Sequence, residues 1–166
     1  KLLLMAMKGF GRQPWWILHL ESSIIAFVMF TIGGYRKKVV ISNLIRVFGN
    51  KKASELTKGF YRNFCDITVE SMKLFTASDK SLLNRVEYSS KGVQLMNRLY
   101  DDNRIVILAG GHMASWEMYA MTFSQKIKFD TMALYKKLSD PIIDEEMRNS
   151  RERLGLKMVE ISECKN

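Results

Sequence analysis

The amino-acid sequence predicts an α/β protein, in which apolar N-terminal helices precede an alternating strand–helix domain with a mostly parallel sheet. Three observations carry this prediction. The first 35 residues are strongly apolar, short β-branched runs alternate with helix-compatible stretches after residue 85, and the composition is that of a folded chain. Alternating strands and helices are typical of parallel sheets. With 47% hydrophobic residues and only two prolines, the 166 residues suffice for one core and exclude a disordered or loop-rich secreted protein.

The first long element is expected over residues 14–35, an apolar stretch with Trp15 near its start and Tyr35 at its end. As a helix it would be about 33 Å long, close to the thickness of a bilayer core. His19 and Glu21 lie inside it, however, and an acid near the middle of a span costs about 3 kcal/mol. A helix lying at the membrane interface therefore fits as well as a spanning helix. A buried helix of a soluble core is a third interpretation, and a cleavable signal peptide fits poorly.

The net charge of +9 is concentrated in the same part of the chain. Residues 1–52 hold nine basic residues and one acid, Glu21, so the remaining 17 basic and 16 acidic residues contribute only +1. Nucleic-acid-binding proteins usually spread Lys and Arg over a folded face, whereas basic residues beside an apolar helix suit an anionic lipid surface. We therefore expect an anionic membrane surface, and no nucleic acid, as a partner.

Two helices are expected next, over 36–48 and about 53–75, with Gly49-Asn50 between them and Ser54 as a possible N-cap. Shorter units follow. We expect strands at 86–89, 105–109, 131–135 and 157–161, and helices at 91–100, 113–123 and 141–154. The run 105–109 reads Ile-Val-Ile-Leu-Ala and stops at a glycine pair, which predicts a fully buried parallel strand.

The turn after residue 109 carries the strongest chemical signal, because ligands of open α/β sheets bind at the carboxyl ends of strands. Gly110-Gly111 leads into His112, and Glu117 follows five residues later. Two residues at that spacing do not share a helix face, but they can meet if His112 sits in the turn and folds back over the helix start. A histidine oriented by a carboxylate can act as a general base. In the alternative, His112 caps the helix and Glu117 is a surface acid.

Several blocks occur in a recognisable order over most of the chain. They are Tyr35-Arg36-Lys37-Lys38-Val39-Val40, Asn43-Leu44, Phe48, Val69-Glu70, Gly111-His112-Met113-Ala114-Ser115-Trp116-Glu117, Tyr135-Lys136-Lys137-Leu138, Arg148, Arg151 and Gly155. Together they resemble the bacterial lipid A biosynthesis acyltransferases of the lauroyl/myristoyl type, a lysophospholipid-acyltransferase-like family. The chain has Ser115 where the family usually has Asn and Gly49 where it usually has Pro. It also ends before the family's Asp-Gln block, so we expect a fragment whose sheet is incomplete at the C-terminus.

The resemblance implies transfer of a fatty acyl group from acyl carrier protein to a hydroxyl of a lipid A precursor, at the cytoplasmic face of the inner membrane. It implies a general base and an orienting carboxylate, together with residues that bind substrate. The general base would be His112 and the orienting carboxylate Glu117. The substrate-binding residues would be Arg151, Tyr135, Lys136 and Gly111. It further implies an apolar membrane-associated segment over 1–35 and the N-terminal portion of an acyltransferase domain over 36–166.

No cofactor and no metal site is expected, because Cys65 and Cys164 lie far apart and form no ligand spacing. Two other functions stay open at this point. One is an acyltransferase acting on another glycolipid or on a lysophospholipid, and the other is a non-catalytic membrane-surface protein in which His112 is structural.

Overall fold

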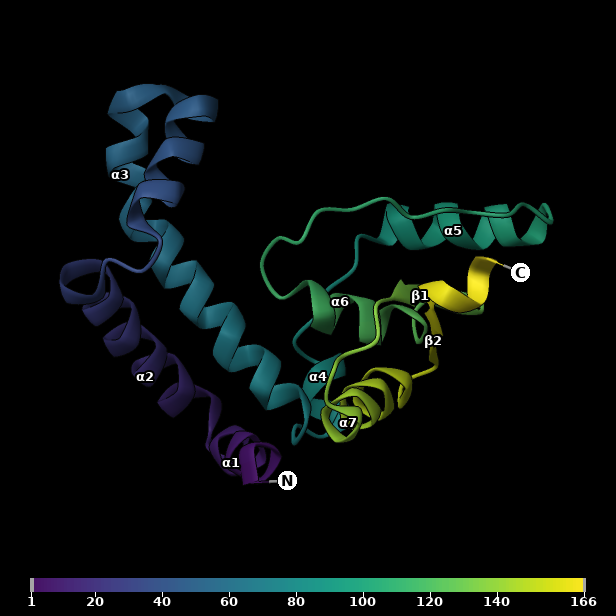
Figure 1. Ribbon diagram of the computed structural model, residues 1–166. Coiled ribbons are helices and arrows are strands. Elements are labelled where there is room, and N and C mark those ends of the chain that lie inside the picture. Colours follow the sequence, from purple (N-terminus) through teal and green to yellow (C-terminus); the bar gives the residue numbers. More distant parts are fainter. Residues whose placement is uncertain (1, 166) are drawn as a thin grey trace.

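The computed structural model describes residues 2–165 and is mostly helical. Its elements, in chain order, are α1 (Leu2–Gly11), α2 (Trp15–Val28), the π-helical turn η1 (Met29–Gly33), α3 (Lys37–Leu74), α4 (Asp79–Leu83), α5 (Ser90–Asp101), α6 (Trp116–Phe123), β1 (Thr131–Tyr135), α7 (Pro141–Glu152), β2 (Leu156–Glu160) and the 3₁₀ turn η2 (Ile161–Lys165). Figure 1 shows two parts: a helical arm made of α1, α2 and α3, and a mixed part that runs from α4 to the C-terminal end.

Within the arm, α2 lies along the second half of α3 (Figure 1). Ala26, Tyr61 and Cys65 form a buried apolar cluster between them, and Met29 and Phe30 of η1 pack against it. Packing of this kind removes apolar surface from water and so stabilises the pair of helices.

A seam of polar side chains accompanies this cluster. The Ser22 hydroxyl donates to Asp66 Oδ1 over 2.5 Å. The His19 ring lies between two carboxylates, with Nδ1 3.6 Å from Asp66 and Nε2 3.5 Å from Glu70. Asp66 and Glu70 are four residues apart and therefore share one face of α3. His19, one of the two polar residues that interrupt the apolar stretch 14–35, thus faces α3, whereas Glu21 accepts a hydrogen bond from the Gln13 side-chain amide over 3.2 Å.

The opposite face of α2 is apolar and exposed. It carries Trp16, Leu20, Ile24, Phe27 and Val28, and Ile32 continues it into η1. Within residues 2–165, Trp15–Ile32 is the one helical stretch that has the length and composition to cross a bilayer. An apolar face opposite a polar one is also the arrangement of helices that lie in a membrane interface.

The chain reverses direction inside α3. Gly49 has φ 78° and ψ 166°, and the helix folds back there so that residues 37–48 lie beside the second half (Figure 1). Glycine adopts a positive φ without the steric cost that a Cβ would bring. The two separate helices predicted on either side of Gly49-Asn50 are confirmed.

The mixed part has a core of six buried side chains from α3, α4, α6 and the segments that follow α3 and α7: Leu74, Ala77, Leu82, Met118, Met121 and Leu154. Strands β1 and β2 pair in parallel, with Thr131 opposite Leu156 and Tyr135 opposite Glu160. Helix α7 connects them, as expected of a β–α–β unit. The predicted fold class, mixed α/β with parallel pairing behind apolar helices, is confirmed.

Two predicted strands are absent from the described chain. Residues 86–89 and 105–109 have no regular structure, and Ile105 and Ile107 are 98% and 90% exposed. Figure 1 shows the second segment as part of the long loop between α5 and α6. A strand needs a hydrogen-bonded neighbour for its backbone. Within residues 2–165 the sheet has two strands and none of its members pairs with 105–109, so the prediction of a buried strand there was wrong.

The junction of α1 with α3 depends on a glycine. A Cβ on Gly11 would lie 2.6 Å from the Met72 carbonyl oxygen, whereas one on Gly9 would meet no atom within 4 Å. Gly11→Ala should therefore lower the free energy of unfolding by about 1–3 kcal/mol through overpacking. Gly9→Ala should raise it by about 0.5–1 kcal/mol through helix propensity. Urea denaturation followed by circular dichroism measures both, and equal effects of the two substitutions would contradict the close packing.

The α2–α3 seam should make stability depend on pH. Burial raises the pKa of Glu70 above its ordinary value of 4.5, and Asp66 raises it further, while His19 and Arg85 oppose the shift. An acid with a raised folded pKa binds more protons in the folded state, so stability falls as pH rises through that pKa. Glu70→Gln removes this pH-dependent change in the free energy of unfolding.

The unfolding free energy of Glu70→Gln, relative to wild type, should therefore increase as pH rises from below 4.5 to neutral. Denaturation curves collected across this range measure the difference. Glu87→Gln, at an exposed position, is the matched control and should show a flat difference. A flat or falling difference for Glu70→Gln would refute the assignment.

Candidate functional site

His112 is exposed in the loop that leads into α6. Its ring packs edge-on against the Trp116 indole, with ring centroids 4.4 Å apart and an interplanar angle of 67°. A tight turn produces this contact. The Met113 amide donates to the Gly111 carbonyl over 2.9 Å, Ala114 has φ 49°, and the Trp116 amide donates to the Ala114 carbonyl over 2.9 Å.

The glycine pair before His112 has no left-handed backbone angle. The left-handed residue of this turn is Ala114, and neither Gly110 nor Gly111 has a positive φ. A Cβ on Gly110 would meet nothing within 4 Å, and one on Gly111 would meet only the Met113 side chain, at 3.6 Å. The space beside this pair is therefore open, which leaves room for another molecule to approach His112 closely.

Glu117 lies in the first turn of α6, and its carboxylate pairs with Arg151. Arg151 Nη2 donates to Glu117 Oε1 over 2.6 Å. The two side chains are only 14% and 18% exposed, so the pair is largely shielded from water. The Arg151 guanidinium also lies 6.0 Å from the Trp116 ring centroid. Trp116 thus contacts His112 and lies beside Arg151.

Helix α7 places Arg151 in its last turn. The helix begins at an Asp140 cap, whose Oδ1 accepts from the amides of Ile142 and Ile143, and near its end Ser150 donates to the Leu74 carbonyl over 3.2 Å. These contacts hold α7 against α3, so the position of the guanidinium follows from packing between elements far apart in sequence.

The expected contact between His112 and Glu117 is not formed. Within residues 2–165 no hydrogen bond or ion pair joins the two side chains, and Glu117 is engaged by Arg151 instead. A charge-assisted bond to a guanidinium is stronger than one to a neutral imidazole, which accounts for the preference. The structure therefore brings together His112, Trp116, Arg151 and Glu117 as a chain of contacts.

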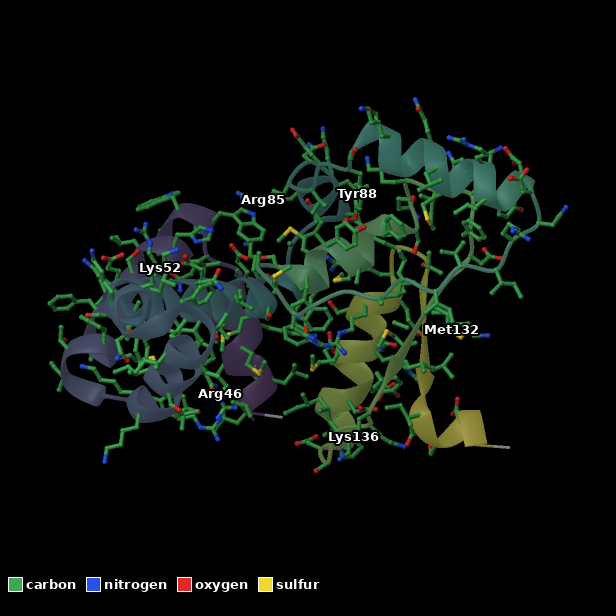
Figure 2. The ribbon with its side chains drawn as sticks, turned by 90° about the horizontal axis from the view of Figure 1, so that it is seen from above. Arg46, Lys52, Arg85, Tyr88, Met132 and Lys136 are labelled. Atoms are coloured by element: carbon green, nitrogen blue, oxygen red, sulfur yellow. The ribbon has the colours of Figure 1, made fainter. Side chains whose placement is uncertain are left out.

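The two candidates at the end of β1 lie apart from this chain of contacts. Tyr135 is half-buried opposite Glu160, and Lys136 is exposed at the next position. Lys136 lies in the segment between β1 and α7. Figure 2 shows it far from Tyr88, whose ring packs against Tyr119 of α6. In the described part of the chain, neither Tyr135 nor Lys136 has a hydrogen bond, ion pair or ring contact with His112 or Glu117.

Helix α6 itself is held by Tyr88. The phenol hydroxyl donates to the Tyr119 carbonyl over 2.6 Å and lies 2.7 Å from the Thr122 hydroxyl. Burial raises the pKa of Tyr88 to about 12, so this group stays a hydrogen-bond donor at neutral pH.

Trp116 and Glu70 were not assigned a role from the sequence. A cavity of about 10 Å³ separates the second half of α3 from the start of α6, and Glu70, Ser71, Trp116 and Glu117 are among its lining residues. That volume is about enough for one water molecule. The signal that could have pointed to Glu70 is its four-residue spacing from Asp66, which places two acids on one face of a helix.

Comparison with known proteins gives one positive result. The sequence model of a family described as bacterial lipid A biosynthesis acyltransferase matches residues 2–165. No curated protein and no solved structure matches the chain.

The Glu117–Arg151 pair should couple the stabilities of its two members. In a double-mutant cycle with Glu117→Gln and Arg151→Gln, we expect a coupling of about 1–3 kcal/mol, because the pair is shielded from water. The exposed Lys128–Asp101 pair, with side chains 51% and 57% exposed, is the matched control and should give about 0–1 kcal/mol. Chemical denaturation of the four variants of each cycle measures the coupling. Indistinguishable values for the two pairs would show that shielding does not strengthen the first.

Proposed function

The chain belongs to the bacterial lipid A biosynthesis acyltransferase family, whose sequence model spans residues 2–165, and we propose that it transfers a fatty acyl group from acyl carrier protein to a hydroxyl of a lipid A precursor. The observation that supports this proposal best is that the ring nitrogens of His112 are free within the described part of the chain. Its ring is held against Trp116, yet neither ring nitrogen has a hydrogen-bond or ion-pair partner among residues 2–165. A general base needs a nitrogen that is free to accept a proton.

In the proposed reaction, His112 takes the proton of the acceptor hydroxyl as the oxygen attacks the thioester carbonyl. The tetrahedral intermediate collapses, the carbon–sulfur bond breaks, and the proton passes from the imidazolium to the leaving thiolate. The open space beside Gly110 and Gly111 suits the approach of a substrate to this nitrogen. No covalent acyl-enzyme is needed.

Glu117 and Arg151 would stabilise charge in this reaction. The Glu117 carboxylate lies in the first turn of α6 and pairs with Arg151, so its part is to hold the guanidinium in place. Arg151 is anchored by Glu117 and lies beside Trp116. Its guanidinium is therefore a candidate to bind a substrate phosphate or to stabilise the oxyanion of the intermediate.

The donor and the membrane would be contacted by other parts of the chain. Lys136 is exposed next to Tyr135, and a positive charge there suits an acidic carrier protein. The exposed apolar face of α2 suits the interface of an anionic bilayer, with the polar seam turned toward α3. We therefore favour an interfacial position for α2, at the cytoplasmic face of the inner membrane, where carrier protein and precursor are both available.

Replacing His112 tests the proposal. His112→Ala should reduce acyl transfer by about 10²–10⁴-fold, because the general base is lost. Met113→Ala, at the adjacent exposed position, is the matched control and should retain activity. Membranes containing the protein are assayed with acyl carrier protein as donor, and the products are identified by mass spectrometry.

Alternative acceptors in the same assay separate the possible substrates. Product formed on a lysophospholipid or another glycolipid, and not on the lipid A precursor, would move the assignment to that acceptor. Near-normal turnover of a folded His112→Ala protein would overturn the mechanism. Membrane binding without acyl transfer by the wild-type protein would favour a non-catalytic role.

A further inference from the structure

An open apolar groove lies between the two halves of α3, outside the residues that approach His112. Its volume is about 400 Å³. The lining side chains come from the start of α3 and from the stretch that packs back onto it: Tyr35, Arg36, Val39, Val40, Asn43, Leu44, Val47, Phe48, Phe60 and Phe64. Pockets of about 300–1,000 Å³ are the usual size of small-ligand sites.

Aromatic rings and aliphatic side chains form the groove. The rings of Tyr35 and Phe64 stack with centroids 6.4 Å apart, and those of Phe60 and Phe64 with centroids 6.2 Å apart. Val40 is buried, while Val47 and Phe48 are 70% and 50% exposed. A contiguous exposed apolar surface of this kind marks an interaction site more often than chance.

Hydrogen bonding fixes one end of the groove. The Tyr61 hydroxyl donates to the Tyr35 carbonyl over 2.6 Å, and the next residue, Arg36, has φ 51°. The Lys37 ammonium lies 5.0 Å from the Phe30 ring centroid. The segment that joins η1 to α3 is thereby held in place, with Arg36 among the residues that line the groove.

The stretch of chain that forms the groove is strongly basic. Residues 35–64 contain eight basic side chains and one acid, Glu55, so the net charge of this stretch is 8 − 1 = +7. The eight are Arg36, Lys37, Lys38, Arg46, Lys51, Lys52, Lys58 and Arg62. Within residues 2–165 none of them takes part in an ion pair. Figure 2 shows Arg46 and Lys52 on the outside of this part of the arm.

We propose that this groove binds one acyl chain of an anionic membrane phospholipid, whose phosphate is held by Arg36 and the basic side chains around it. Charge complementarity points to an anionic occupant, because the basic side chain of Arg36 lines the groove and residues 35–64 carry a net charge of +7. Basic residues near an anionic lipid surface favour binding to it. The exposed apolar residues Phe27 and Ile32 precede the groove in sequence.

This lipid is bound and not consumed. Figure 1 shows the turn of α3 at the far end of the helical arm from α6, and the groove shares no lining residue with the cavity beside Glu117. Lipid binding in the groove is therefore independent of acyl transfer by His112.

Photo-crosslinking in vesicles tests the groove directly. The full-length protein is added to phosphatidylcholine vesicles that contain phosphatidylglycerol with a photoreactive group in its acyl chain, and cross-linked peptides are identified by mass spectrometry. Cross-links are expected on 39–48 and 60–64. Val47→Trp fills the groove and should reduce their yield by about tenfold or more. Ile45→Trp, on the same helix but outside the lining, should leave the yield within about twofold.

A second arm tests the headgroup. In Arg36→Gln, the cross-linking yield with photoreactive phosphatidylglycerol should fall to the yield that a photoreactive phosphatidylcholine gives. The yield with phosphatidylcholine should be the same in this variant and in the wild type. Circular dichroism confirms that each variant folds, and Leu44→Trp replaces Val47→Trp if the latter does not. Cross-links confined to α2, an unchanged yield in a folded groove-filling variant, or a protein–protein cross-link at 39–48 would each overturn the proposal.

Discussion

The polar seam between α2 and α3 is the interaction on which the rest of the structure depends. Ser22 bonds to Asp66, and His19 lies between Asp66 and Glu70. Because polar groups removed from water need partners, this seam sets the rotation of α2 about its axis. The apolar face of α2 is consequently turned outward, and the second half of α3 is held where it can reach both α6 and the groove-forming residues 37–48.

Glu70 connects this seam with the candidate site. On one side the Glu70 carboxylate lies 3.5 Å from Nε2 of the His19 ring. On the other side Glu70 lines the small cavity beside Trp116 and Glu117. The site itself is organised around the Trp116 indole, which contacts His112 and lies beside the Arg151 guanidinium. An aromatic ring supplies a rigid platform for both groups. The arm therefore supports the site as well as presenting a membrane-facing surface.

The local signals in the sequence identified most of the helices and the two strands that pair. The glycine at position 49 and the amphipathic stretches around it predicted two helices, because glycine and helical periodicity act within a few residues. The same reasoning failed at 105–109. That run has β-branched residues and a glycine stop, but a strand also needs a neighbouring strand, and within residues 2–165 none pairs with it.

By itself, the sequence determined the apolar and basic character of the N-terminal part, the mixed α/β class, and the position of His112 directly after a glycine pair. These properties follow from composition and from spacing along the chain. Only the tertiary structure decided that Glu117 pairs with Arg151, that His19 faces Asp66 and Glu70, and that residues 35–64 enclose a groove. Each of these features depends on how helices and turns pack against one another, and no local pattern along the chain specifies that packing.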